Sequence, residues 1–370
     1  MKKETSQVAN ELIKRLDTHL NDENIGNPFF PERGIRHSPL TTDGFKEIQR
    51  VDSDKKIAFV DGGNQEVFGA PNFSVQLNRV YFGMWSGNKR IPEKSIPQRI
   101  EFFAATFSDF ERGEIHYNTS LFPLSGEEAI LPRERDLSFS SMDRSITIGT
   151  QRADIYRVGS ISRRFSELVL AKSVVENELA PGDVIVLDGT LQTAFPNEYA
   201  YLDELSQAAQ KKGVILAGLS KTSALFTDTG YSLLGALDKL SAEKGITTEW
   251  YYPIADGTSK DHFVFILGVK LNAISERIFR LEIQRDQFLS LDERALNEIL
   301  TQLVQNSADY TFPGYPYGLI DADRFARVTS LEREHYFAIL RSQMAAMGKW
   351  EKFYRHVKAT DAHNVLNKLG

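Results

Sequence analysis

The chain has 370 residues, of which 41% are hydrophobic and 25% charged, and its formal net charge is −6. These proportions are typical of a globular protein and exclude a disordered or fibrous chain. The absence of cysteine excludes disulfides, thiolate zinc sites and a cysteine nucleophile. The negative charge argues mildly against a nucleic-acid binder, although a metal-dependent nuclease needs an acidic pocket and can gather its basic residues locally.

The N-terminal segment lacks the features of a targeting signal. Its two lysines are not followed by the ~7–15 apolar residues of a signal peptide. No stretch of the chain reaches the ~18 apolar residues of a membrane span. We therefore expect a soluble, cytoplasmic protein with no membrane partner.

Residues 1–50 are expected to form an N-terminal helix and a loop. Apolar residues recur at every fourth position from Val8 to Leu20, which predicts an amphipathic helix over residues 1–22. Residues 23–50 are rich in Asn, Pro and Gly, so a loop is predicted there.

Residues 51–330 are expected to form the main domain, which begins with a run of strands. The apolar residues 57–60 predict a buried strand that stops at a glycine turn, Asp61-Gly62-Gly63. Aromatic and β-branched residues predict a meander of further strands over residues 73–85, 100–110 and 114–121. An insertion at 86–100 holds four basic residues and one acidic residue, so it is either a contact for DNA or a partner, or a solvated surface.

Strands and helices alternate in the second half of this domain. Helical spacing predicts a helix over 154–179, and the apolar run 184–187 predicts a buried strand that ends at Asp188-Gly189. Further helices are expected at 197–212, 231–244 and 291–305, and further strands at 214–219, 250–254, 263–269 and 278–283. This alternation predicts an α/β fold with parallel strands.

The end of the chain is expected to be helical. Helical patterns cover residues 321–328 and 331–347, and residues 331–370 are interpreted as a C-terminal helical extension. Its stretch 349–358 is basic, and the same two interpretations apply to it as to the insertion.

Two predicted strands end in the same dipeptide, at Asp61-Gly62 and at Asp188-Gly189. Ligands of open α/β sheets bind at the carboxyl ends of strands, so two such carboxylates converge if the strands are neighbours. The alternative is that both are ordinary turns, because Asp-Gly is a common turn pair.

Glu167 is the third acidic candidate, on the helix predicted over 154–179. A buried carboxylate requires a partner. Arg163 and Arg164 lie one turn earlier and could provide an ion pair, and a metal ion is the other possibility. Glu176 and Glu178 on the same helix are alternative choices for this acid.

Clustered carboxylates repel one another unless a hard divalent cation neutralises them. Mg²⁺ and Mn²⁺ favour oxygen ligands, and two such ions can promote phosphodiester hydrolysis. The sequence contains no GxxxxGK[ST], GxGxxG, HExxH or GxSxG motif, which argues against a P-loop ATPase, a dinucleotide enzyme, a zinc protease and a serine hydrolase.

With these motifs in view, the chain resembles the NurA nuclease family from about Lys56 to about Thr329. The matching motifs are the strand and Asp-Gly at 57–62, the Arg and Glu of one helix at 163–167, Asp-Gly-Thr-Leu at 188–191, Ser-Lys-Thr at 220–222, and Gly-Tyr-Pro-Tyr at 314–317 with Ala322-Asp323. The resemblance implies an RNase H-like mixed-sheet core flanked by helices, with peripheral N- and C-terminal helices.

The resemblance also implies site residues. Asp61, Glu167 and Asp188 would be the metal ligands. Many family members have a histidine where this chain has Asp323. Asp323 could bind metal or orient water, or it could be an acid near a helix N-terminus that the helix dipole favours.

Two further residues receive expected roles. Tyr315 would lie at the edge of the site near the substrate phosphate. Lys221 would contact a phosphate or stabilise developing charge, with an ordinary exposed lysine as the alternative.

The function implied by the resemblance is hydrolysis of DNA phosphodiester bonds with Mn²⁺ or Mg²⁺, at single-stranded or duplex ends, as a 5′–3′ exonuclease with possible single-strand endonuclease activity. It also implies a homodimer that works with a HerA-type hexameric ATPase in DNA end processing and repair. The alternatives are a catalytically silent scaffold that docks a ring ATPase or binds DNA, and a nuclease directed at RNA.

Overall fold

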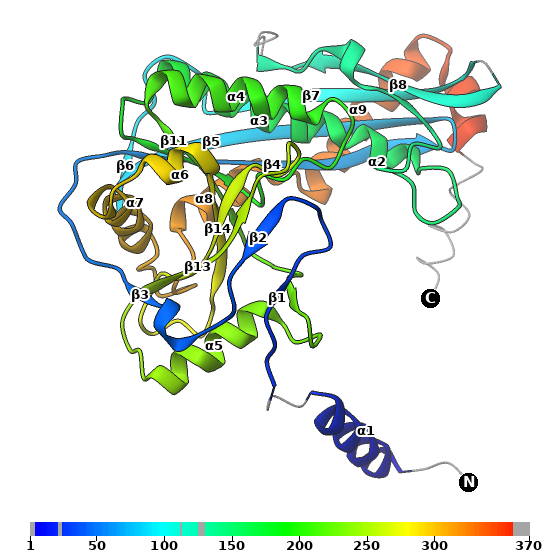
Figure 1. Cartoon of the computed structure of the whole chain (residues 1–370). Coiled ribbons are helices and arrows are strands. Elements are labelled where there is room, and N and C mark those ends of the chain that lie inside the picture. Colours follow the sequence, from blue (N-terminus) through cyan, green and yellow to red (C-terminus); the bar gives the residue numbers. More distant parts are fainter. Residues whose placement is uncertain (1–3, 21–23, 112, 125–129, 358–370) are drawn as a thin grey trace.

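The computed structural model describes residues 4–20, 24–111, 113–124 and 130–357. Within them, 13 strands form one mixed sheet with helices packed on it (Figure 1). Its centre consists, in spatial order, of β7 (Arg99–Glu111), β5 (Phe73–Ser86), β4 (Ile57–Ala70), β10 (Val184–Asp188) and β11 (Ile215–Ser220). β10 is parallel to β4 and β11, whereas β5 is antiparallel to β4 and β7. The expected RNase H-like α/β class is confirmed.

Further strands extend this centre on both sides. Beyond β11 lie β15 (Phe279–Gln284), β14 (Val264–Lys270), β13 (Trp250–Gly257) and β2 (Ile35–His37), and beyond β7 lie β8 (Glu114–Pro123) and β9 (Ser138–Ser140). β3 (Lys46–Glu47) pairs with β13, β6 (Lys89–Ile91) pairs with β5, and β1 (Pro28–Phe29) pairs with β12 (Phe226–Thr227) in a separate ladder. The predicted loop at 23–50 is therefore wrong in part, because short strands within it add to existing sheet edges.

Two hydrophobic cores hold helices against opposite faces of the sheet. One contains Val60 and Leu187 with Phe165 of α3 (Ile161–Asn177), and α4 (Glu198–Lys212) packs beside α3 (Figure 1). The other contains Phe59 with residues of α7 (Glu293–Asn306) and α8 (Tyr317–Ala326). Further helices are α1 (Thr5–His19), α2 (Ile155–Gly159), α5 (Leu233–Lys244), α6 (Arg285–Ser290), α9 (Ser330–Ala346) and the 3-10 turns η1 (Thr42–Gly44) and η3 (Glu134–Asp136).

The terminal helices are peripheral, as expected. α1 has no buried residue and stands apart from the rest of the chain in Figure 1. α9 begins with a capping box in which Thr329 and Glu332 satisfy each other's backbone N–H groups. The ends of the predicted helix 1–22 and the last part of the extension, residues 358–370, lie outside the described residues. Among the helices described, none has the length and apolar character needed to cross a membrane.

The predicted glycine turn after residue 60 is wrong. β4 continues without a break through Asp61, Gly62 and Gly63 to Ala70, and neither glycine has a positive φ. The glycines serve close packing instead of chain reversal. A Cβ on Gly62 would lie 2.4 Å from Oε1 of Glu167, and a Cβ on Gly63 would lie 2.4 Å from the carbonyl oxygen of Ala326.

The insertion at 86–100 is built into the fold. Its Arg90 forms an ion pair with Asp321 of α8, at 3.2 Å. The backbone N–H groups of Lys94, Ser95 and Ile96 donate to the buried carboxylate of Glu178, which follows α3. Glu178 is thereby engaged with the insertion, and contact of the insertion's basic residues with DNA or a partner stays a prediction.

A buried arginine ties α9 and the end of α8 to the sheet. Arg79 of β5 donates to Glu101 at 2.8 Å, to Glu332 at 2.6 Å and to the carbonyl oxygen of Arg327 at 2.6 Å. Burial alone would raise the pKa of Glu332, but Arg79 and the N–H of Thr329 lower it to about 2. Because the folded pKa lies below the usual 4.5, this carboxylate stabilises the fold above pH 4.5 and loses that effect as pH falls toward 2.

Replacing Glu332 with Gln should lower the free energy of unfolding by about 1–2 kcal/mol at pH 7, because a charge-assisted hydrogen bond is lost. Urea denaturation measures the difference, which should shrink as pH falls from 4.5 toward 2. The exposed Glu334 of the same helix provides the control, Glu334→Gln, for which we expect no change. A pH-independent loss in Glu332→Gln would contradict the assignment to the charge.

Candidate metal centre

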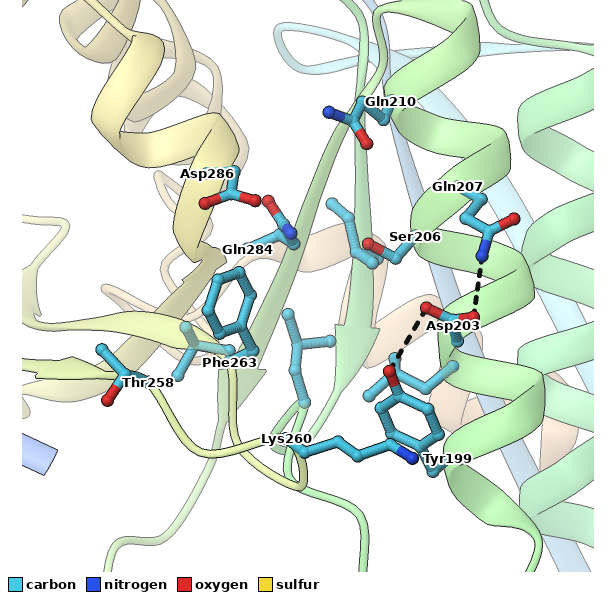
Figure 2. A pocket seen from close by; sticks show the side chains of 14 residues that line it. Tyr199, Asp203, Ser206, Gln207, Gln210, Thr258, Lys260, Phe263, Gln284 and Asp286 are labelled. Atoms are coloured by element: carbon cyan, nitrogen blue, oxygen red, sulfur yellow. Dashed lines mark hydrogen bonds between the residues drawn. The ribbon is translucent and has the colours of Figure 1, made fainter. Parts of the chain in front are cut away.

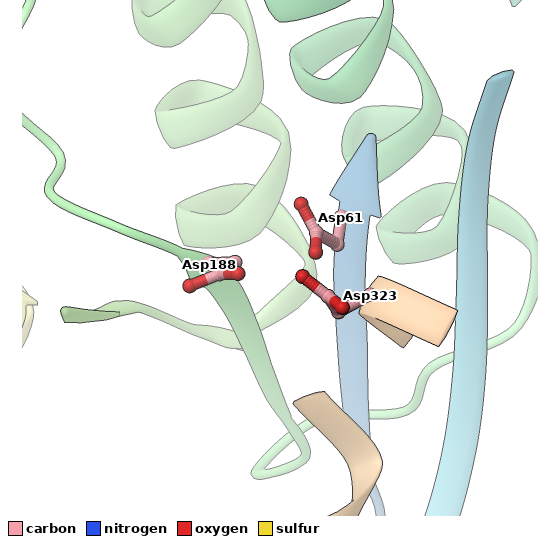
Figure 3. Close-up of side chains that lie close together, drawn as sticks. All are labelled: Asp61, Asp188 and Asp323. Atoms are coloured by element: carbon pink, nitrogen blue, oxygen red, sulfur yellow. The ribbon is translucent and has the colours of Figure 1, made fainter. Parts of the chain in front are cut away.

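Three aspartates from three elements converge beside the sheet (Figure 3). Asp61 lies within β4, Asp188 is the last residue of β10, and Asp323 lies on α8. One carboxylate oxygen of each residue lies within 4.8 Å of the other two. The structure therefore brings together the two Asp-Gly motifs and adds Asp323, and these three residues are called the acidic triad below.

Strand register explains why the first two aspartates meet. β4 and β10 pair in parallel with Val60 opposite Leu187, so the following residues, Asp61 and Asp188, emerge side by side. Side chains alternate along a strand, and Val60 and Leu187 point to the core under α3. Asp61 and Asp188 therefore point to the opposite face, which α8 covers.

Glycine contacts near both ends of α8, one from Gly318 of the helix and one from Gly63 of β4, bring Asp323 to this pair. Gly318, near the start of α8, packs on Phe59 of β4 so closely that a Cβ would lie 2.0 Å from the ring. Near the other end, the carbonyl oxygen of Ala326 rests on Gly63. Two contacts without side chains thus fix the distance between α8 and β4, and Asp323 lies between them.

Asp61 is the member of the triad whose pKa is raised. Burial, together with Asp188 and Glu167, raises its pKa to about 8, although Lys221 and the Gly62 N–H act in the opposite direction. The Gly62 N–H donates to Asp61 Oδ1 at 2.7 Å. A third negative charge is therefore unfavourable here unless further positive charge is supplied.

Lys221 supplies part of that positive charge. It follows β11, and its Nζ lies 2.6 Å from Asp188 Oδ2 and 2.9 Å from Asp323 Oδ1. Burial lowers the pKa of Lys221, but the two aspartates and Asp61 outweigh burial and raise it. Lys221 is an exposed lysine that pairs with two aspartates, and its expected contact with a phosphate stays a prediction.

Tyr315 lies beneath the triad, where it is 1% exposed. Its hydroxyl donates to Asp188 Oδ1 at 3.2 Å. Burial and the neighbouring carboxylates raise the pKa of Tyr315, so its hydroxyl remains a donor. Tyr315 thus holds Asp188 through Oδ1, whereas Lys221 binds the other carboxylate oxygen, Oδ2.

Asp323 lies in the last turn of α8, which contradicts the alternative of an acid near a helix N-terminus. Its two oxygens have separate cationic partners, Lys221 on Oδ1 and Arg327 on Oδ2, both at 2.9 Å. Burial would raise the pKa of Asp323, but these two cations lower it overall. Asp323 is therefore an ionised member of the triad.

Glu167 lies close to Asp61 but outside the triad. Its carboxylate is 5% exposed and pairs with Arg163 and Arg164 of the same helix. Arg164 also donates to Glu198 at 2.8 Å and to the carbonyl oxygen of Thr190 at 3.2 Å. The ion-pair interpretation describes this arrangement, and a metal-ligand role for Glu167 stays a prediction.

The donor set of the triad fits a hard divalent cation. All three groups are carboxylates, and oxygen ligands of this kind suit Mg²⁺ and Mn²⁺. Burial is the main cause of the raised pKa of Asp61, and the charges of Asp188 and Glu167 raise it further against the effect of Lys221. When bound, such an ion supplies the positive charge that the three carboxylates lack.

A separate pocket of about 410 Å³ lies between α4 and the β14–β15 side of the sheet (Figure 2). No residue of the triad lines it. Its α4 side chains bond with one another, because Gln207 and Tyr199 both donate to Asp203, at 2.7 and 3.5 Å. Lys260 lies over the Tyr199 ring at 4.0 Å. The described residues that line this pocket do not form a group of converging carboxylates like the triad.

Sequence reasoning missed Arg327. Its position four residues after Asp323 allows an ion pair on one helical turn, and this spacing is visible in the sequence. The predicted helix spanned residues 321–328, which placed Asp323 near its start, whereas the observed α8 begins at Tyr317 and has Asp323 in its last turn.

The comparisons with known proteins agree with this geometry. The family model for the NurA domain matches residues 55–328. The chain belongs to the NurA family. The resemblance inferred from the sequence is thereby confirmed, and membership of this family supports a nuclease. A search of curated proteins found no match.

Two solved structures are similar to this NurA-family chain at low sequence identity. The NurA nuclease from Sulfolobus solfataricus has a TM-score of 0.51 and 14% identity, and the match covers 94% of this chain and 96% of that one. Endonuclease V from Ciona intestinalis, in complex with a DNA that contains an inosine followed by a ribo-adenosine, has a TM-score of 0.35 and 14% identity over 87% and 96% of the chains.

The close approach of α8 to β4 can be tested with Gly63→Ala. The added Cβ must displace the backbone at Ala326, so we expect a loss of about 1–3 kcal/mol in the free energy of unfolding. Because Asp323 moves with α8, added Mg²⁺ should also raise the urea midpoint less than in the wild type.

Gly83→Ala is the matched control. Gly83 lies in β5 without a positive φ, and a Cβ there would meet its nearest neighbour at an ordinary 3.6 Å. Equal effects of the two substitutions on the urea midpoint would contradict a specific role for the Gly63 contact.

Proposed function

We propose that this NurA-family chain hydrolyses DNA phosphodiester bonds with a hard divalent cation, Mn²⁺ or Mg²⁺, held by Asp61, Asp188 and Asp323. The observation that carries the proposal is the convergence of the three carboxylates within 4.8 Å beside Lys221. An ion held by these residues would supply Lewis-acid chemistry for phosphodiester hydrolysis. Glu167 is retained as a further candidate ligand because of its proximity to Asp61.

The remaining residues of the centre act on orientation and charge. In this proposal, Lys221 Nζ donates to a non-bridging oxygen of the scissile phosphate and stabilises the charge of the transition state. Tyr315 keeps Asp188 in position through Oδ1. Arg163 and Arg164 hold Glu167 and thereby limit the negative charge next to Asp61.

Finer features of the proposal follow the family resemblance. We propose action at single-stranded and duplex DNA ends in the 5′–3′ direction, with endonuclease activity on single strands. We further propose a cytoplasmic homodimer that works with a HerA-type hexameric ATPase in DNA end resection and repair. The domain division at residues 50 and 330 belongs to the same proposal.

The proposal is tested by cleavage of end-labelled single- and double-stranded DNA, with matched RNA, in Mn²⁺, Mg²⁺ or EDTA. We expect wild-type cleavage of DNA with metal only, and a loss of about 100-fold or more in Asp188→Asn, because a carboxylate ligand of the cation is removed. Asp238→Asn on the exposed surface of α5 is the control and should cleave like the wild type.

The other outcomes separate the alternatives. Cleavage of RNA in preference to DNA would favour the RNA-directed nuclease. If the wild type is silent in every metal, the assay is repeated with a HerA-type ATPase. Silence there as well would favour the scaffold and overturn the proposed hydrolysis.

A further inference from the structure

Arg327 has no role in the function proposed above, yet it contacts the acidic triad. Its guanidinium donates to Asp323 Oδ2 at 2.9 Å, while its side chain is 68% exposed. The other arginines beside the centre are less accessible, at 27% for Arg163 and 14% for Arg164, and both are engaged with Glu167. Arg327 is thus a solvent-exposed cation beside the triad, and its side chain can exchange Asp323 for another partner.

The backbone of Arg327 is fixed although its side chain is exposed. Its carbonyl oxygen accepts a hydrogen bond of 2.6 Å from buried Arg79. Its Cα lies 3.2 Å from the position that a Cβ on Gly63 would occupy, two residues along β4 from Asp61. A guanidinium on this anchored position can swing without moving α8 or the sheet.

Charge balance connects Arg327 to the metal. The triad carries three carboxylates, and Lys221 and Arg327 each occupy one oxygen of Asp323. A divalent cation that binds Asp323 competes with both for the same oxygens, and its two positive charges equal the charge of the two side chains. Binding of the ion therefore offsets the negative charge that attracts Arg327 to Asp323.

We propose that binding of a divalent cation releases Arg327 from Asp323, and that Arg327 then binds a backbone phosphate of the DNA strand next to the scissile bond. The planar guanidinium suits this partner, because it can donate two parallel hydrogen bonds to phosphate. The inference rests on the proposed function, since it assumes that DNA reaches the triad.

The test measures the affinity for fluorescein-labelled single-stranded DNA as a function of salt, with Ca²⁺ or with EDTA. Ca²⁺ is a hard cation that binds carboxylate oxygens, and a gel verifies that the DNA stays intact. Each phosphate contact contributes about 0.7 to the slope of log affinity against log salt on single strands. In Ca²⁺, Arg327→Gln should lower the slope by about 0.7, and in EDTA it should leave the slope unchanged.

Arg324→Gln is the matched control on the same helix. Arg324 is exposed and lies one turn from Arg327, facing Asp321 and not the triad. It should leave the slope unchanged in both conditions. Thermal unfolding of Arg327→Gln should match the wild type, because the backbone contact with Arg79 does not involve the side chain. Ca²⁺ should bind this variant more tightly than the wild type, because Arg327 no longer competes for Asp323.

Asp323→Asn gives an independent test in EDTA. This substitution removes the charge that holds Arg327, so the arginine should bind DNA without any metal. Adding Arg327→Gln in the Asp323→Asn background should then lower the slope by about 0.7 in EDTA, although it has no effect there in the wild-type background.

The inference is overturned if Arg327→Gln leaves the slope unchanged in Ca²⁺, or changes it equally in Ca²⁺ and EDTA. If the proposed function fails, the wild type itself neither binds nor cleaves DNA. If only the inference about Arg327 fails, wild-type binding and cleavage remain intact, so the two failures are distinguishable.

Discussion

Mutual repulsion among three carboxylates is the constraint on which the rest of the centre depends. Asp61, Asp188 and Asp323 lie within 4.8 Å of one another, and such a group is unfavourable unless cations offset it. Lys221 and Arg327 provide two positive charges beside the triad, and burial together with Asp188 and Glu167 raises the pKa of Asp61 to about 8. A group of carboxylates in this setting could bind a divalent cation.

Strand pairing and close packing contacts hold the three carboxylates in this unfavourable arrangement. Parallel pairing of β4 with β10 fixes Asp61 beside Asp188. Gly318 and Gly63 remove the side chains that would hold α8 away from β4, and buried Arg79 ties the end of α8 to the sheet. Packing and backbone hydrogen bonds therefore determine how closely the carboxylates approach.

Local sequence pattern predicted much of this molecule because many elements are decided locally. The apolar run 184–187 and its Asp-Gly stop are confirmed, since a buried strand and a glycine of positive φ leave a clear pattern. The glycines after Asp61 were misread as a turn, because their function is to accommodate α3 and α8, which are distant in sequence. The position of Asp323 in the last turn of α8 depended on where this helix begins, and the predicted start was residue 321 instead of 317.

The central claim is that the triad binds a hard divalent cation, and the most direct test is titration of the DNA-free protein with Mn²⁺, followed by electron paramagnetic resonance of the unbound ion. The account predicts saturable binding in the wild type, and affinity at least about 10-fold weaker in Asp61→Asn and Asp323→Asn, because each removes a carboxylate ligand. Equal binding in the wild type and both variants would place the ion elsewhere and contradict the account.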